Sequence, residues 1–236
     1  VLAAYKERCV GTVPKIGFVS PSRANLEILS KYFPVKKWRT AAIMNANLYP
    51  APTVGRTEAD HVRILYIGRL AATKGVDVLL SVAQNLAKNY KFDVTVIGGG
   101  PDEAALRAKF GGEPWCKFTG FISQQEISNV IVNSDVLCIP SIWAENSPGV
   151  VIQALGLGLP VIGSDKAGIP ELVENEVNGL LVPPGDLPAW ETALERVLRQ
   201  PSCLKPWREH ALANAHKFNQ DYLGSKILDF IQHKTP

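Results

Sequence analysis

The sequence predicts an α/β fold with a doubly wound, Rossmann-like parallel sheet, and three observations support this. From residue 62 onward, short apolar runs typical of buried strands alternate with segments whose apolar residues recur at helical spacing. About six such strand–helix units follow one another, which favours parallel strands covered by helices on both faces. Loops with glycine or proline separate many of the units. In such sheets the connections are right-handed, and ligands bind at the carboxyl ends of the strands.

Each expected element rests on its own pattern. Residues 62–68 (VRILYIG) form a mostly apolar run that ends at a glycine, as a buried strand does. Residues 75–89 carry apolar side chains at positions 76, 79, 80, 83, 86 and 87, which is helical spacing. Ser123 and Glu126 have the spacing of a capping box. The expected order is strand 62–68, helix 75–89, strand 92–100, helix 101–110, strand 115–121, helix 123–133, strand 135–140, helix 149–158, strand 160–165, helix 169–175, strand 179–182 and helix 186–200.

The two ends of the chain differ from this core. Residues 15–22 and 40–47 are expected strands with a helix at 22–33, and residues 48–60, with two prolines and a glycine, are an expected linker. Two strands and one helix cannot form a stable core alone. We therefore predict that residues 1–55 are the tail of another domain with a linker, or a flank packed on the main domain. Residues 56–200 are predicted to form the Rossmann-like domain, and residues 201–236 the C-terminal helices.

The composition argues against several classes of protein. The formal net charge is only +3 and no run of five basic residues exists, so no nucleic-acid partner is expected. No apolar run reaches the roughly 18 residues of a membrane span. The cysteines lack CxxC spacing and nearby histidines, so we expect free thiols in a reducing, cytoplasmic compartment and no metal site. These cysteines are Cys9, Cys116, Cys138 and Cys203.

The loop after the first core strand carries two cations. Gly68 ends the strand, Arg69 and Lys74 follow within one loop, and Gly75 opens the next helix. Arginine offers a rigid fork for phosphate oxygens and lysine a compact mobile charge, so this pair could hold a diphosphate beside the helix start. A solvated pair on a surface loop is the alternative.

The expected strand 92–100 ends in three glycines. Such a run lets the backbone approach a ligand closely, but a tight strand-to-helix turn explains it equally well. It is not a GxGxxG fingerprint, because Pro101 and Asp102 interrupt it, and it lacks the Lys-Ser or Lys-Thr pair of a Walker loop.

The stretch SIWAENSPGVVIQALG combines an acid with a helix start. Ser147 is predicted to be the N-cap and Pro148 the first helical residue, while Gly149 leaves the backbone N–H groups uncovered. Free N–H groups at a helix start carry roughly half a positive charge and attract anions. Glu145 would accept hydrogen bonds from ligand hydroxyls, and Gln153 lies about two turns along the helix. Ordinary capping, with Gln153 on a helix flank, is the alternative.

A similar feature follows the expected strand 160–165. Gly168 precedes Ile169 and Pro170, so we expect another helix start at the carboxyl end of a strand. It would offer a second set of N–H donors to the ligand. A purely structural turn is the alternative.

Taken together, these motifs resemble those of one known family, the retaining family 4 glycosyltransferases. The order and spacing of that family are matched by IGRLAATKG, VIGGGP, FTGF, PSIWAENSPGVVIQALGLGLPVI, SDKAGIPELV and NGLLVPPGD. The resemblance is strong over residues 60–200 and looser over 15–50. It implies the GT-B fold of two facing Rossmann-like domains, of which this chain resembles the donor-binding half with the tail of the N-terminal domain.

The resemblance implies roles for the candidate residues. Arg69 and Lys74 match the pair that binds the donor's diphosphate, and Glu145 matches the first acid of an E-x7-E motif, which touches the donor sugar. Gln153 stands where the second acid binds ribose hydroxyls. A neutral amide can still accept one hydrogen bond and donate another, but it weakens this grip by about 1 kcal/mol or more. The other implied substrate-binding positions are Gly68, Ile122, Asn146, Ser147, Pro148, Gly149, Val150 and Gly168.

The implied reaction is transfer of a sugar, of hexosyltransferase type, from a nucleotide-diphosphate sugar to a glycan or lipid-linked glycan with retention of configuration. The catalytic residues would be Glu145, Arg69 and Lys74, with the cations stabilising the charge that builds on the leaving diphosphate. No metal or other cofactor is expected. The acceptor would bind the missing N-terminal domain, so we expect an inactive fragment of a cytoplasmic enzyme that contacts the membrane, if at all, through that missing part.

Three other functions fit parts of the pattern. A non-catalytic nucleotide-sugar-binding module is compatible with the truncation and with Gln153. A GT-B epimerase or phosphorylase shares the fold, but the further acid pairs or the pyridoxal-binding lysine motif expected of these enzymes are not seen. An NAD-dependent dehydrogenase is disfavoured by the missing GxGxxG fingerprint and by the Arg-Lys loop.

Overall fold

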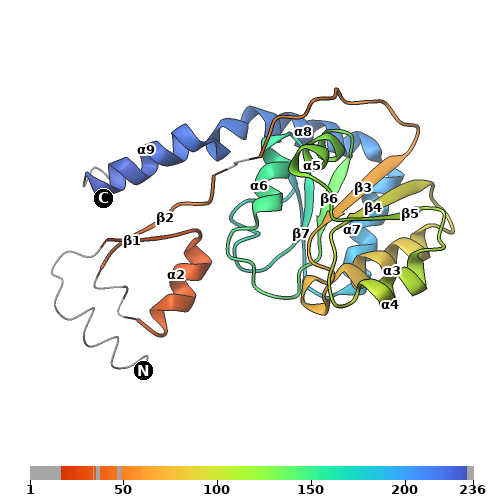
Figure 1. The fold of residues 1–236 in the computed structure, drawn as a ribbon, viewed down its shortest axis with the longest axis horizontal. Coiled ribbons are helices and arrows are strands. Elements are labelled where there is room, and N and C mark those ends of the chain that lie inside the picture. The colour runs from red at the N-terminus through yellow and green to blue at the C-terminus, as the bar shows by residue number, and fades with distance from the viewer. Residues whose placement is uncertain (1–16, 34, 36–37, 47–48, 233–236) are drawn as a thin grey trace.

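The computed structural model describes residues 17–33, 35, 38–46 and 49–232. Two sheets lie within these ranges, a two-stranded sheet near the N-terminus and a six-stranded sheet in the larger part of the molecule (Figure 1). The six-stranded sheet contains the strands predicted from residue 62 onward. It is therefore the part that positions the candidate site.

The six-stranded sheet is parallel throughout and has the strand order of a doubly wound fold. The order is β5-β4-β3-β6-β7-β8, and every neighbouring pair is parallel. The order reverses between β3 and β6, so the carboxyl ends of these two strands flank the crevice where ligands bind in such sheets. The predicted fold class is confirmed. The strands are β3 Val62–Ile67, β4 Phe92–Ile97, β5 Cys116–Gly120, β6 Val136–Ile139, β7 Val161–Ser164 and β8 Gly179–Val182.

Helices cover both faces of this sheet because successive strand side chains point to opposite faces. Within β3, Ile64 and Tyr66 pack in one buried cluster and Leu65 packs in the other. Within β6, Cys138 and Leu137 are divided in the same way. The first cluster includes α3 Val76–Leu86, α4 Glu103–Phe110 and α7 Leu187–Arg199, and the second includes α5 Gln124–Val132 and α6 Gly149–Gly156.

The predicted helix at 169–175 is wrong. This segment forms a series of turns between β7 and β8, although Ile169 and Val173 are both buried, four residues apart, as on a helix face. The side chain of Asn178 accepts a hydrogen bond from Glu174 N at 2.9 Å and donates one to Leu172 O at 3.2 Å. It thus takes up backbone groups that a helix would pair with one another.

Helix α5 begins with the predicted capping box. Glu126 N donates to Ser123 Oγ at 3.2 Å, and Ser123 N donates to Glu126 Oε2 at 2.8 Å. These reciprocal bonds satisfy two N–H groups that a helix start leaves without partners. Hydrogen bonds from the Ser123 hydroxyl and N–H also lower the pKa of the Glu126 carboxyl.

The same helix holds the predicted linker through two asparagines one turn apart. Asn129 Oδ1 accepts from Thr53 N, and Asn133 Oδ1 accepts from Thr57 N, each at 2.8 Å. The hydroxyls of both threonines donate to the same two oxygens. Because these bonds occupy linker backbone as well as side chains, residues 53–57 are fastened to the six-stranded part.

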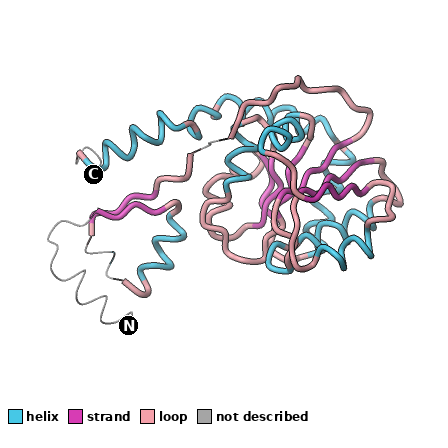
Figure 2. Tube along the Cα trace, in the orientation of Figure 1, coloured by secondary structure: helices cyan, strands magenta, loops and turns pink. Residues whose placement is uncertain are grey.

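The N-terminal part contains the predicted strand–helix–strand unit, β1 Gly17–Ser20, α2 Arg23–Ser30 and β2 Arg39–Ala42, with β1 and β2 parallel. Two helices follow the last core helix, as predicted: α8 Leu204–Ala213 and α9 Gln220–Ile231. Figure 2 shows α9 running back to lie beside the two-stranded sheet. There the Arg39 guanidinium lies 4.2 Å from the centre of the Phe230 ring. The boundaries proposed between the three parts stay predictions.

The described cysteines lie in the core part of the molecule as free thiols. Cys138 is buried in β6, and Cys116 is half-buried in β5, where burial raises the pKa of its thiol to about 11. Cys203 is also half-buried, and Cys9 lies outside the described residues. None of the helices in the described ranges is both long and apolar enough to cross a membrane.

Candidate functional site

The loops after β3 and β6 meet at the reversal of strand order. Ile142 N and Trp143 N, in the loop after β6, both donate to Thr73 O at 3.0 Å. Gly75 closes the other loop in a left-handed conformation with φ 63°, and a Cβ there would lie 2.1 Å from Pro140 O. This glycine is therefore required for the two loops to approach each other. The short helix η2 (Ala72–Lys74) carries the predicted lysine into the contact.

Two predicted catalytic residues are paired. Lys74 Nζ forms an ion pair with Glu145 Oε1, and Ser141 Oγ donates to the same oxygen at 2.9 Å. The Glu145 side chain is only 17% exposed, against 32% for Lys74. The carboxylate is thus held in one orientation by a cation and a hydroxyl, and Ser141 is a site residue that the sequence pattern did not indicate.

Arg69 lies on the same loop with its side chain exposed, and its guanidinium forms no hydrogen bond to any described residue. Its backbone is anchored instead, because the Tyr66 hydroxyl donates to Arg69 O at 3.0 Å. Burial, followed by the nearby Glu145 and Asp77 carboxylates, raises the pKa of Tyr66 well above its usual range. The phenol therefore stays neutral and keeps this hydrogen bond at any ordinary pH. Arg69 therefore presents a cation that no described residue neutralises.

The glycine run after β4 supports this loop. Gly98 has φ 123°, and a Cβ there would lie 2.1 Å from Gly68 O. A Cβ on Gly100 would lie 2.3 Å from Leu70 O. Backbone packing against the Arg69 loop thus accounts for Gly98 and Gly100, which is a structural reason other than the tight turn that the sequence suggested. Gly68, which precedes Arg69 in this loop, is half-buried.

The start of α6 differs from the prediction by one residue. The helix begins at Gly149 with Pro148 as its cap residue, so Ser147 is not the N-cap and Pro148 is not the first helical residue. The Ser147 hydroxyl oxygen is buried without a hydrogen-bond partner among the described residues. The first two helical N–H groups, of Gly149 and Val150, likewise have no partner in the described part of the chain. These two groups are the donors that the helix start presents.

Gly168 does not open a helix, so the prediction of a second set of N–H donors there is wrong. Its N–H donates to Glu145 O at 2.7 Å. A Cβ on Gly168 would lie 1.8 Å from Asn146 O. Gly168 therefore fixes the backbone of the loop that carries Glu145 and the exposed Asn146. Lys166, which the sequence pattern also missed, braces the same loop by donating to Ile142 O at 2.8 Å.

Gln153 faces the interior. Gln153 is only 2% exposed, and its side-chain Nε2 donates to Ser128 Oγ at 3.1 Å. Ser128 in turn donates to Pro50 O at 2.7 Å. Ile122, another of the implied substrate-binding residues, is half-buried just after β5, next to the exposed Phe121. The structure thus does not bring Gln153 to the Lys74–Glu145 pair, and its role with ribose stays a prediction.

Replacing Gln153 with glutamate is expected to lower the free energy of unfolding by about 1–3 kcal/mol, because a carboxylate cannot donate to Ser128 Oγ and would be buried. Urea unfolding measures this, and Gln124→Glu, the same change at an exposed position on α5, is the control. Equal stability of the two variants would contradict the buried hydrogen bond. Donor affinity of the same variant tests the ribose prediction, which expects tighter binding.

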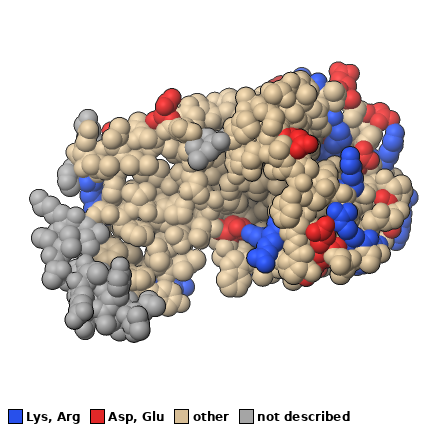
Figure 3. All heavy atoms as spheres, in the orientation of Figure 1, with Lys and Arg blue, Asp and Glu red and all other residues tan. Residues whose placement is uncertain are grey.

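A cavity of about 390 Å³ adjoins the loop of Glu145 and reaches the N-terminal part. Across it, the Glu171 carboxylate accepts from Arg23 N and Ala24 N, each at 2.9 Å. In Figure 3 charged side chains gather over the six-stranded part, while the N-terminal part and α9 are mostly uncharged on this face. Among the described residues there is no group of three or more potential metal ligands. The cavity lining includes Ser22, Met44, Asn146, Ser147, Gly168 and Glu171.

Comparisons with known proteins agree with this geometry. The profile of the family described as "Glycosyl transferases group 1" matches residues 61–200. The amylovoran biosynthesis glycosyltransferase AmsK of Erwinia amylovora is 32% identical over 181 residues, which are 72% of this chain and 44% of that protein. The alpha-D-kanosaminyltransferase of Streptomyces kanamyceticus is 30% identical over 156 residues, 64% of this chain and 40% of that protein. The chain thus spans less than half the length of these relatives.

Solved structures share the fold. Sucrose-phosphate synthase from Thermosynechococcus elongatus matches with a TM-score of 0.77 and 21% identity, over 92% of this chain and 58% of that one. Anabaena HepE in complex with UDP-glucose matches with a TM-score of 0.75 and 20% identity, over 91% and 63%. Such neighbours are GT-B glycosyltransferases. The profile match covers the whole six-stranded sheet and both loops of the candidate site, and the chain therefore belongs to the group 1 glycosyl transferases.

Proposed function

We propose that the six-stranded part binds a nucleotide-diphosphate sugar and that the intact protein transfers the sugar to a hydroxyl of a glycan or lipid-linked glycan. The observation that carries this proposal is the contact between the loops after β3 and β6 at the reversal of strand order. These loops, with the start of α6, carry Arg69, the Lys74–Glu145 pair and the N–H groups of Gly149 and Val150, which have no partner among the described residues. Cations and helix-start N–H groups suit phosphate oxygens. A carboxylate held by Lys74 suits sugar hydroxyls.

The chemistry follows from where charge develops. When the glycosidic bond to the nucleoside diphosphate breaks, negative charge builds on the phosphate oxygens, and the exposed Arg69 guanidinium and the start of α6 stabilise it. Lys74 holds Glu145 and adds positive charge beside the leaving group. We propose retention of configuration, as the resemblance to family 4 implies, with the leaving phosphate helping to deprotonate the acceptor. Such a front-face reaction needs no protein nucleophile, metal or other cofactor.

The short span of the chain limits this proposal to donor binding for the chain itself. The matched regions are 44% and 40% of two longer relatives, whose names include amylovoran biosynthesis and kanosaminyl transfer. We propose that acceptor binding, hexosyl transfer and any contact with the membrane surface belong to the intact protein, which acts in the cytoplasm. The N-terminal part, the linker and the C-terminal helices would then join the two halves.

A non-catalytic nucleotide-sugar-binding module is the second candidate, favoured by the buried amide of Gln153 where the family motif has an acid. Both candidates bind the donor, but only the first transfers sugar. An assay of sugar transfer by the intact protein separates them, since a module would bind the nucleotide sugar without turnover.

Calorimetric titration of the chain with UDP, GDP, ADP and their sugar conjugates tests donor binding. Neighbours crystallised with UDP or UDP-glucose make the uridine compounds the first choice. We expect saturable binding of one nucleotide series, and the base of that series identifies the donor. Absence of binding by a folded chain across the whole panel would contradict the proposal.

A further inference from the structure

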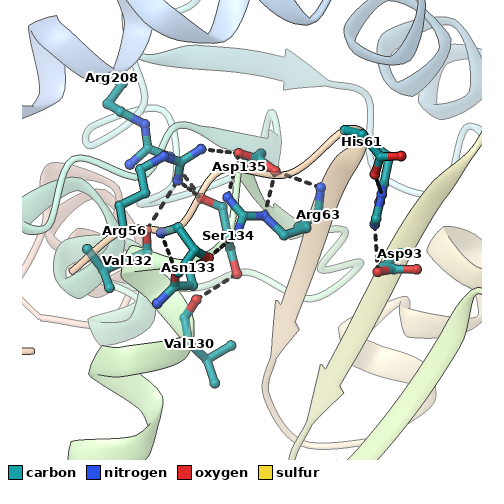
Figure 4. Close-up of polar contacts among 12 residues, drawn as sticks. Arg56, His61, Arg63, Asp93, Val130, Val132, Asn133, Ser134, Asp135 and Arg208 are labelled. Carbon is teal, nitrogen blue, oxygen red and sulfur yellow. Dashed lines mark hydrogen bonds and ion pairs between the residues drawn. The ribbon is translucent and has the colours of Figure 1, made fainter. Parts of the chain in front are cut away.

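A second cluster of cations lies at the amino ends of the strands of the six-stranded sheet, where β3 and β6 begin. Arg56 comes from the linker, Arg63 from β3 and Arg208 from α8 (Figure 4). Figure 4 shows their side chains gathered around Asp135 and the backbone of Ser134. Since the candidate donor site is at the carboxyl ends of the strands, this cluster is separated from it by the length of the sheet.

One carboxylate serves two of these arginines. Asp135 forms ion pairs with Arg56 Nη2 and, at 3.0 Å, with Arg63 Nε. Asp135 Oδ2 also accepts from Arg63 N at 2.8 Å. The Asp135 side chain is 13% exposed, so these bonds are largely shielded from water. Both oxygens of this carboxylate therefore accept hydrogen bonds from Arg56 or Arg63.

The third arginine, Arg208, forms no ion pair with a carboxylate of the described residues. Arg208 Nη2 donates to Ser134 O at 2.8 Å, which is the only hydrogen bond of this guanidinium to a described residue. The same carbonyl accepts from Arg56 Nη1 at 2.6 Å, which places two guanidinium groups at one oxygen. Burial, followed by the neighbouring Arg56, lowers the pKa of Arg208 to about 10. A cation in such surroundings is stabilised by an added anion.

The space for an anion lies beside Arg208. A pocket of about 350 Å³ is lined by Arg56, Arg208 and the exposed Lys205. Two carboxylates, Asp60 and Asp135, also line it, but both already have cationic partners. Asp60 is paired with Lys91 and contacts His61, and Asp135 is paired with Arg56 and Arg63. The pocket therefore has more positive than negative groups and is large enough for a phosphate group with a substituent.

We propose that this pocket, at the amino ends of the strands, binds a phosphate group between Arg56, Arg208 and Lys205. Guanidinium groups match phosphate oxygens with paired N–H donors, and lysine adds a mobile charge at the rim. The bound anion joins the linker, through Arg56, to α8, through Arg208. It thus fastens the connection between the N-terminal part and the six-stranded part at a place other than the donor site.

Residue-resolved NMR of the 15N-labelled chain tests the site. Inorganic phosphate is titrated at constant ionic strength and pH 7, and the side-chain Nε–H signals of the arginines and the backbone signals around Ser134 are followed. We expect saturable shifts at Arg56, Arg208 and Ser134 that fit one dissociation constant. Phosphate that binds at Arg69 moves a different set of signals, so the two sites are distinguished.

Charge reversal at the rim provides the matched comparison. Lys205→Glu is expected to weaken phosphate binding in the pocket about tenfold, because it replaces a cation with an anion. Lys205 is exposed and forms no hydrogen bond to a described residue, so this change spares the fold. Lys117→Glu, the same change at an exposed position of β5, should leave the dissociation constant unchanged. If phosphate binding does not saturate, or if the two variants bind phosphate with equal affinity, the proposal is overturned.

A second experiment distinguishes two sources of the phosphate group, a lipid headgroup and a soluble phosphate compound. Glycerol 3-phosphate is titrated as inorganic phosphate is, and cosedimentation is measured with vesicles of phosphatidylglycerol and of phosphatidylcholine. Cosedimentation with the first vesicles alone, lost in Lys205→Glu, identifies a lipid headgroup. Binding of glycerol 3-phosphate without cosedimentation identifies a soluble phosphate compound. If neither probe nor inorganic phosphate binds, the pocket is not a phosphate site.

Discussion

Replacing both Arg69 and Lys74 with alanine should weaken binding of a nucleoside diphosphate by about a hundredfold or more. Each charge-assisted hydrogen bond to phosphate is worth about 1.5–3 kcal/mol, and the change removes two cations that are proposed to form such bonds. Loss of Lys74 also frees the Glu145 carboxylate from its ion pair, which leaves negative charge where the phosphates bind. Isothermal titration calorimetry with the nucleotide that the wild-type chain prefers measures the effect.

A surface arginine provides the control for this loss. Arg107 pairs with Glu103 on the exposed side of α4, so Arg107→Ala removes a cation and an ion pair outside the candidate site. We expect its nucleotide affinity to equal that of the wild type. Circular dichroism must show that the double variant is folded, since the Lys74–Glu145 pair joins two loops. Wild-type affinity in a folded double variant would show that the diphosphate binds elsewhere.

Replacing Gly168 with alanine is expected to destabilise the chain by about 1–3 kcal/mol and to weaken nucleotide binding as well. The new Cβ would lie 1.8 Å from Asn146 O and 2.9 Å from Glu145 O, so the backbone has to move. That movement breaks the hydrogen bond from Gly168 N to Glu145 O and shifts the loop that presents Glu145. Urea unfolding and calorimetry of the same preparation measure the two effects.

Gly112→Ala is the matched control, because a Cβ at Gly112 meets no atom within 4 Å. It should retain wild-type stability and affinity. If Gly168→Ala were as stable as this control, the close contact with the Asn146 carbonyl would be contradicted. If it were destabilised but bound nucleotide normally, the loop of Glu145 would not contribute to donor binding.

The parallel sheet and its two covered faces were predictable from the sequence. Apolar runs such as 62–67 have no polar alternation, which predicts burial on both faces, and the structure divides Ile64 and Leu65 between two clusters. The capping box at Ser123 and Glu126 was also predictable, because both its partners lie within one helical turn. Local signals of this kind depend on neighbours in the chain, so sequence spacing reveals them.

The helix expected at 169–175 shows where local spacing is insufficient. The apolar pattern of this segment is helical, yet Asn178 takes its backbone hydrogen bonds, and a short crossover between β7 and β8 has to be completed within the same residues. Likewise, Pro148 rather than Ser147 is the cap residue of α6. In the first case the Asn178 side chain competes with the backbone for the same groups.

The fold class and the loops that carry the candidate site follow from the order of the residues, because burial periodicity and strand-to-helix loops are properties of consecutive residues. Which side chains meet depends on how the chain folds. The fold pairs Lys74 with Glu145, 71 positions apart, and it binds Gln153 to Ser128 in the interior. It also brings Arg208 and Arg56 to one carbonyl oxygen, that of Ser134. Such contacts depend on strand order and on the packing of helices, which bring together residues that no spacing in the chain relates.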